Sequence, residues 1–250
     1  MMILYSILFF LFGSLFASFF QLLAYRLPNK ETLFGRSYCP NCHVDLRMID
    51  VLPIFGYIIN RGRCHFCHEK ISLSYLLTEI LGGFLFTVAY LIIGFEWELI
   101  VALVLILVLL TESITDITKM LVIDKIWMIG MIPIIIIRFI QGSFTDYFIS
   151  AFTMFGLLFL VSLIGRMIAK KEVLGGGDVK LYLFIGFTML LPQAFLSLFL
   201  ASIFGVIYAI IRKKRQSSYL PLVPFIFIGV LISYFYGTIL IHWYLNLLGM

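Results

Sequence analysis

The sequence predicts an all-α polytopic membrane protein with about eight transmembrane helices, and three observations support this fold class. Of its 250 residues, 62% are hydrophobic and only 12% are charged, whereas roughly a quarter of the residues of a soluble domain are charged. The mean hydropathy is +1.10. The apolar residues fall in long runs, of which 100–110 is an example. Lipid is therefore the expected main solvent, which excludes a single soluble domain and a disordered chain.

Eight apolar runs follow one another along the chain. The first, 2–25, is expected to be a retained span, because no basic residue precedes Arg26 and no secretory cleavage site is present. The others lie at about 73–94, 99–115, 121–140, 147–168, 179–191, 194–211 and 220–248. The run 179–191 is short for a span, which leaves a tilted or re-entrant helix as the alternative there. Only 26–72 is polar and long enough to fold outside the membrane, which divides the chain into 1–25, 26–72 and 73–250.

The basic residues predict the orientation in the membrane. All 18 of them except Arg138 fall on one side if the N-terminus lies outside. Basic residues accumulate in cytoplasmic loops, so we expect an outside N-terminus and a cytosolic segment 26–72. Topology then explains the net charge of +5, and we expect no nucleic-acid partner. The basic run 212–215 is expected to contact anionic membrane lipid.

The segment 26–72 holds two CxxC pairs, whose spacing is typical of a four-thiolate zinc site. The four expected ligands are Cys39, Cys42, Cys64 and Cys67. Two disulfides are the alternative, but disulfides seldom persist in the reducing cytosol. His43, His65 and His68 lie beside the cysteines and offer a substitute ligand, although solvated or second-shell histidines are the simpler interpretation. A closed four-thiolate site has no open coordination position, so the expected Zn²⁺ is structural.

Two acidic residues lie at the cytoplasmic ends of predicted spans. Asp116 ends the third span, and Asp178 precedes the sixth. Acidic residues at such positions are costly and usually functional, and the two can meet if these spans are neighbours. Two close carboxyl groups share one proton, so one polarises a carbonyl while the other activates water. The alternative is that both aspartates only cap helices.

Gly175, Gly176 and Gly177 precede Asp178. We expect them to let the backbone turn sharply and approach a substrate strand without side-chain obstruction. A phosphate-binding loop is the other common use of such glycines, but the basic residue of a P-loop is missing from its place.

With these aspartates, glycines and CxxC pairs, the sequence resembles the type IV prepilin peptidases, a family of bifunctional leader peptidases and N-methyltransferases with a GxGD motif. The GGGDxKL signature of the family is intact at 175–181. Asp116 matches the first catalytic aspartate, with 122–124 as the closing triplet, and the segment 17–28 matches the N-terminal signature. The chain departs from the family pattern at Ala17, where glycine is usual, at Gln21, where asparagine is usual, and at Ile123, where proline is usual.

The resemblance implies an aspartic endopeptidase in the bacterial inner membrane. Its expected substrates are prepilin or pseudopilin precursors, whose short basic leader is removed at the cytoplasmic face. N-methylation of the new N-terminus with S-adenosylmethionine is implied by the resemblance only. Lys180 is expected to orient the glycine loop or to bias the aspartates, unless it only anchors its helix at the lipid headgroups. Glu79 is expected to support the site.

Three other classes compete with this interpretation. A transporter that uses the carboxylate pair as a proton relay is expected to have repeated halves with broken helices, and we find no such repeat. A GxGD protease that cuts within the bilayer leaves the CxxC pairs unexplained. In a membrane-anchored zinc adaptor, Asp116 and Asp178 would be dispensable.

Overall fold

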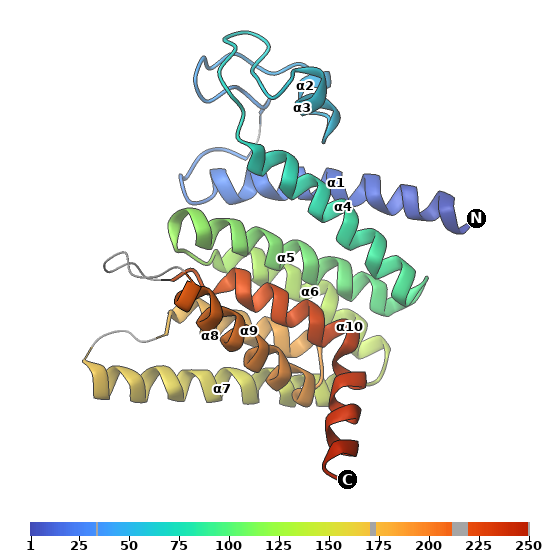
Figure 1. Cartoon of the computed structure of the whole chain (residues 1–250), viewed down its shortest axis with the longest axis vertical. Coiled ribbons are helices and arrows are strands. Elements are labelled where there is room, and N and C mark those ends of the chain that lie inside the picture. The colour runs from blue at the N-terminus through green and yellow to red at the C-terminus, as the bar shows by residue number, and fades with distance from the viewer. Residues whose placement is uncertain (34, 171–173, 212–219, 250) are drawn as a thin grey trace. The chain divides into compact units, whose positions relative to one another are not determined.

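The computed structural model describes residues 1–33, 35–170, 174–211 and 220–249. Within these ranges the chain is helical, and its only β-bridges are two isolated ones. It divides into two compact units, Met1–Leu99 and Ile100–Met250, whose helices are drawn in Figure 1. The basic run 212–215 and Lys171 lie outside the described residues.

All eight predicted apolar runs are helices. The long helices are α1 (Met2–Arg26), α4 (Leu73–Ile93), α5 (Trp97–Lys119), α6 (Asp124–Ile140), α7 (Phe144–Ala169), α8 (Gly176–Thr188), α9 (Leu191–Ile211) and α10 (Val223–Leu247). Within the described residues, six of them are long and apolar enough to cross a membrane, the exceptions being α6 and α8. The predicted all-helical membrane class is therefore confirmed.

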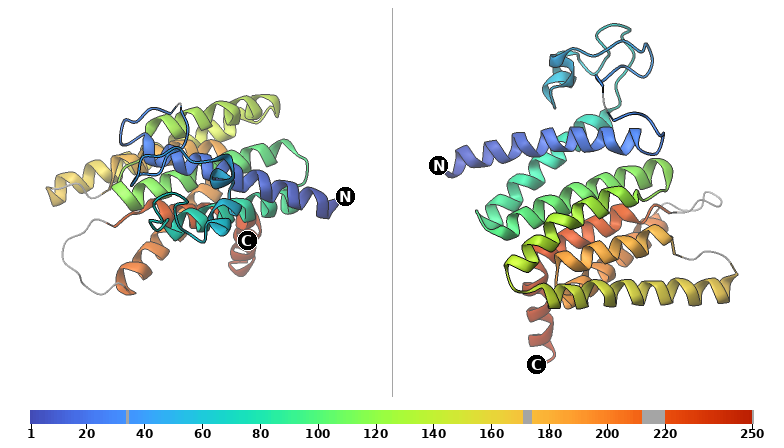
Figure 2. Two further views of the ribbon diagram at one scale, coloured as in Figure 1. Left: turned by 90° about the horizontal axis from the view of Figure 1, so that it is seen from above. Right: turned by 180° about the vertical axis from the view of Figure 1, so that it is seen from behind.

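In the first unit, α1 and α4 pack against each other through small residues (Figure 2, blue and teal). A Cβ atom at Gly13 would lie 2.5 Å from the carbonyl oxygen of Gly82, and one at Gly82 would overlap the methyl group of Ala17. Small residues let two membrane helices approach closely, so that backbone contacts replace side-chain packing. Ala17, which replaces the usual glycine, is fully buried in this contact.

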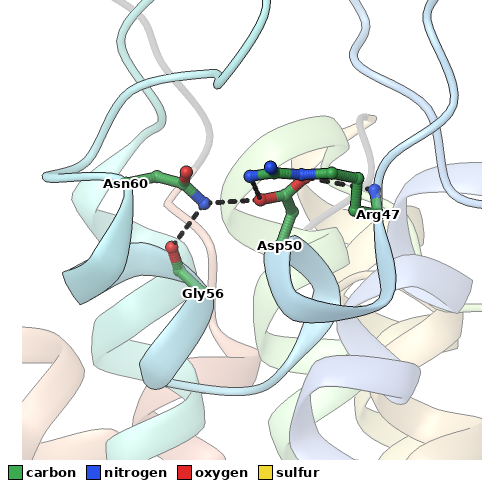
Figure 3. Close-up of polar contacts among 4 residues, drawn as sticks. All are labelled: Arg47, Asp50, Gly56 and Asn60. Atoms are coloured by element: carbon green, nitrogen blue, oxygen red, sulfur yellow. Dashed lines mark hydrogen bonds and ion pairs between the residues drawn. The ribbon is translucent and has the colours of Figure 1, made fainter.

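In the sequence, the polar part of the first unit follows α1 and precedes α4. It contains the short helices α2 (Met48–Val51) and α3 (Phe55–Ile59). Asp50 joins them (Figure 3). Its carboxylate accepts hydrogen bonds from the Arg47 guanidinium at 2.9 and 3.0 Å and from the Asn60 amide at 2.8 Å. The same Asn60 amide donates to the carbonyl oxygen of Gly56 at 2.9 Å. This network fixes a segment that is too short to build a large apolar core.

In the second unit, the part of α5 from Ile100 onward is buried along most of its length. α9 packs on α10 and on α7, and α8 packs between α6 and α7. α8 has 13 residues, which corresponds to about 20 Å and is shorter than the hydrocarbon core of a bilayer. The short helix predicted at 179–191 is therefore found, and it ends among buried residues from Gly186 to Met189.

Arg138 on α6 explains how α8 can end there. Its side chain is fully buried, and its guanidinium donates to the carbonyl oxygens of Phe187 at 3.2 Å and Thr188 at 2.7 Å. Ser150 donates to the carbonyl of Met189 at 3.0 Å. The last carbonyl groups of a helix have no partner within it, so these donors satisfy them. The guanidinium also stacks over the ring of Tyr147, 3.7 Å from its centroid.

Candidate active site and metal site

Asp116 lies in the last turn of α5, and its side chain is directed toward the beginning of α10. Its Oδ2 accepts a hydrogen bond of 2.9 Å from the backbone N–H of Val223, the first residue of α10. The first N–H groups of a helix have no partner within the helix and attract negative charge. The contact therefore orients a carboxyl group that is 8% exposed.

Asp178 lies in the first turn of α8. Asp116 acts electrostatically on its carboxyl group, so the two predicted aspartates lie within range of each other's charge. Gly175 precedes the helix, and a Cβ atom there would lie 2.9 Å from Oδ2 of Asp178. A side chain at this position would press on the carboxylate, which gives one physical reason for glycine.

The other two glycines differ from each other in their surroundings. A Cβ atom at Gly177 would lie 2.7 Å from both Cβ and Cγ2 of Val122, whereas one at Gly176 would meet none of the described residues within 4 Å. None of the three glycines has a positive φ angle. Their backbone angles therefore do not require glycine, and the close approach of neighbouring groups explains Gly175 and Gly177.

Lys180 lies on the second turn of α8 and forms an ion pair of 2.7 Å with Asp124, the first residue of α6. Both side chains are half exposed, so the pair stabilises the fold by at most about 1 kcal/mol. It joins the second turn of α8 to the beginning of α6.

Glu79 lies in the first unit, on α4. It is buried, and its Oε2 accepts a hydrogen bond of 2.7 Å from the backbone N–H of Ile54. Ile54 has a φ angle of 65°, which is uncommon for a β-branched residue. The contact of Glu79 therefore supports a strained backbone position in the polar segment.

The four cysteines form one cluster in the same unit. Their sulfur atoms all lie within 4.8 Å of one another, and those of Cys39 and Cys67 are 3.8 Å apart. Four sulfurs arranged as a tetrahedron about an ion at 2.3 Å would be about 3.8 Å apart, so the donor set fits a metal ion. All four cysteines are free, and the separation is far longer than a disulfide bond.

The two CxxC pairs have the same backbone form, a repeat that the sequence analysis missed. His43 and His68, which follow the two pairs, have φ angles of 56°. Their N–H groups donate to the carbonyl oxygens of Cys39 and Cys64. The cluster of possible metal-binding groups in the described residues contains no histidine, so these two histidines shape the turns.

Sequence reasoning missed two buried charged residues of the second unit. Arg138 donates hydrogen bonds to the last carbonyl groups of α8. Glu112 lies one helical turn before Asp116 and has no exposed surface. The signal for both was a charged residue inside an apolar run, which is costly unless it has a defined partner.

Two family models match the chain, one in its N-terminal part and one in its C-terminal part. Residues 11–93 match the bacterial peptidase A24 N-terminal domain, and residues 103–210 match the type IV leader peptidase family. Three relatives carry the name prepilin leader peptidase/N-methyltransferase. The Vibrio cholerae protein is 30% identical over 92% of this chain and 96% of its own length. The Bacillus subtilis protein is 29% identical over 95% and 97%, and the Legionella pneumophila protein is 30% identical over 84% and 76%.

No solved structure matches the chain. The two matched ranges nevertheless cover most of both units, and they contain the positions of the four cysteines and of the two aspartates. The chain therefore belongs to the type IV leader peptidase family.

Proposed function

We propose that this protein is a membrane-bound aspartic peptidase that removes the leader of prepilins or pseudopilins. The observation that carries the proposal is the pair Asp116 and Asp178, which interact electrostatically in a chain whose relatives are named prepilin leader peptidase/N-methyltransferase. Membership of this family also disfavours the transporter hypothesis.

The pair can hydrolyse a peptide bond without a covalent intermediate. One carboxylate takes a proton from water while the other, protonated, donates a hydrogen bond to the scissile carbonyl oxygen. Hydroxide adds to the carbonyl carbon, and the C–N bond breaks as the departing amine receives a proton. The hydrogen bond from Val223 keeps the Asp116 carboxyl group oriented throughout. No described residue lies within 4 Å of the position of a Cβ atom at Gly176, which leaves room for a substrate strand to approach.

The protein is a multi-pass protein of the bacterial inner membrane, and the distribution of basic residues supports an N-terminus outside and a cytosolic segment 26–72. In this arrangement 1–25 is the first span and 73–250 is the peptidase domain. Cleavage then occurs at the cytoplasmic face, where the basic leader of the substrate lies. Lipid surrounds the apolar helices, and the net charge of +5 requires no nucleic-acid partner.

The cysteine cluster is proposed to hold Zn²⁺ through Cys39, Cys42, Cys64 and Cys67. A closed thiolate site crosslinks its two turns and replaces the apolar core that so short a segment lacks. The name of the relatives also supports methylation of the new N-terminus, with S-adenosylmethionine as the methyl donor. Gly175, Gly177 and Lys180 support the catalytic pair through their contacts, and Glu79 supports the polar segment.

The proposal is tested by replacing Asp116 and Asp178 separately with asparagine. Each variant is co-expressed with a pilin-like precursor in cells that lack another leader peptidase, and leader removal is followed by the shift in precursor mass. Both variants are expected to accumulate in the membrane and to leave the precursor uncleaved. D146N, at an exposed position of α7, is the matched control and is expected to process normally. Complete processing by D116N or D178N would refute the dyad.

The methylation is tested on the product of the wild-type protein. The mass of the mature N-terminal peptide is expected to exceed that of the unmodified sequence by one methyl group. A mature product without this mass would leave the protein a peptidase alone.

A further inference from the structure

Glu112 is a buried carboxyl group that the peptidase mechanism does not use. It lies on α5, one turn before Asp116, and has no exposed surface. Its Oε2 accepts a hydrogen bond of 2.8 Å from the backbone N–H of Ile123 and one of 3.3 Å from the hydroxyl of Thr115. Its Oε1 is buried and has no hydrogen-bond partner among the described residues.

Such a group destabilises the protein unless another effect compensates. Burying a carboxyl oxygen without a hydrogen bond costs free energy, and leucine would fill this helical position without that cost. Thr115 belongs to the same helix, so the N–H of Ile123 is the contact that joins Glu112 to another segment. Any effect of Glu112 on the rest of the protein is therefore expected to pass through the backbone of Ile123.

The segment 120–123 reverses the chain between α5 and α6. Met120 has a φ angle of 52°, and Ile123 precedes α6 without a side-chain cap. The two neighbours of Ile123 both contact the first two turns of α8. Val122 fills the space above Gly177, and Asp124 forms the 2.7 Å ion pair with Lys180. The backbone at residue 123 thus lies between two contacts that hold the beginning of α8.

We propose that Glu112 is a positioning residue of the active site. By accepting the N–H of Ile123, it fixes segment 120–123 against Gly177 and thereby holds Asp178 in place relative to Asp116. The proposal rests on the peptidase function proposed above. It also gives a physical reason for a departure noted in the sequence, because proline, usual in the family at position 123, has no N–H that would need this acceptor.

The hydrogen-bonding role predicts that glutamine can replace Glu112. An amide oxygen accepts the Ile123 N–H as a carboxyl oxygen does. The alternative is that Glu112 transfers protons, since it interacts electrostatically with Asp116 and Asp124. Glutamine cannot transfer protons, so the two roles give opposite results for E112Q.

The test uses purified full-length protein in lipid vesicles and measures kcat, KM and the pH profile of precursor cleavage. E112Q is expected to keep the wild-type pH profile and to stay within a few-fold of the wild-type kcat. E112L is expected to lose on the order of 10²-fold in kcat, the effect of misplacing catalytic groups by about 1 Å, with KM little changed. S113A removes a buried hydroxyl from the same turn of α5 and is the matched control, expected to behave as wild type.

A double-mutant cycle with I123P keeps the test valid if E112L folds poorly. Proline deletes the N–H, and the φ angle of −92° at Ile123 is near the range that proline adopts. I123P alone leaves the Glu112 carboxyl group without its partner, whereas E112L/I123P removes both groups. The double variant is therefore expected to recover at least about tenfold of the kcat lost in E112L, a non-additive result typical of contacting residues.

The outcomes separate this proposal from the proposed function. Wild-type kcat in E112L, or strictly additive losses in the cycle, overturns the positioning role. An inactive E112Q with an altered pH profile overturns it in favour of proton transfer. Cleavage by D116N at a rate near that of the wild type would instead refute the peptidase dyad itself, whatever the Glu112 variants do.

Discussion

Replacing Gly177 with alanine is expected to inactivate the protein by moving Asp178. The added Cβ atom would lie 2.7 Å from Cβ and Cγ2 of Val122, whereas carbon atoms in a packed interior are separated by about 3.5–4.0 Å. The backbone of the GGGD segment or segment 120–123 must therefore move by about 1 Å. Overpacking of this kind destabilises a protein by about 1–3 kcal/mol, which leaves most of the molecules folded.

The catalytic effect should be much larger than the loss of stability. A misplacement of about 1 Å costs on the order of 10²-fold in rate, so G177A is expected to lose about two orders of magnitude in kcat while it still accumulates in the membrane. The assay is the initial rate of precursor cleavage by purified protein at saturating substrate. G156A on α7 is the matched control, because a Cβ atom there would have no described residue within 4 Å.

The exchange variant V122G/G177A tests the cause of this loss. It moves the side chain from one side of the contact to the other, so it is expected to recover at least about tenfold over G177A through the coupling of contacting residues. V122G alone measures the effect of a more flexible loop. Wild-type activity in G177A would refute the claim that this contact positions Asp178.

Three further predictions concern the parts that surround the site. R138M should remove the donors to Phe187 and Thr188 and destabilise the purified protein by about 3 kcal/mol or more, since a hydrogen bond from a charged group contributes about 1.5–3 kcal/mol; an unchanged thermal midpoint would contradict this role. A strong chelator should release about one zinc ion per chain and expose segment 26–72 to proteases, and metal analysis without zinc would contradict the site. The Arg47 guanidinium lowers the pKa of Asp50, so its stabilisation is fully present above the unfolded pKa of about 3.9 and is lost progressively as the pH falls from there through the lower folded pKa; D50N should weaken hydrogen-exchange protection of 47–60 more at pH 6 than near pH 2.

Much of the fold was predictable because lipid imposes a simple rule on the sequence. Every apolar run of sufficient length must satisfy its backbone internally, so it becomes a helix. The CxxC pairs were equally informative, since two such pairs at this spacing are typical of a four-thiolate metal site. The aspartates stood out because carboxyl groups at the ends of apolar runs are rare.

The remaining features depend on contacts between segments that are distant in sequence. Arg138 interrupted the charge pattern, but only the buried end of α8 explains why a guanidinium is needed there. Glu112 looked like one more polar residue near the end of a span until Ile123 was found to donate to it. The glycines were expected to let the backbone turn sharply and approach a substrate strand. The structure shows that Val122 leaves no space for a side chain at Gly177, and that the Asp178 carboxylate leaves none at Gly175.

The central claim is that Asp116 and Asp178 together cleave the precursor. The most direct measurement is the initial rate of cleavage by purified wild-type protein, D116N and D178N in lipid vesicles, at equal amounts of folded protein. General acid–base catalysis by one positioned group contributes about 10²–10⁴-fold, so each variant is expected to fall by at least 10²-fold. A rate within a few-fold of wild type for either variant would contradict the account.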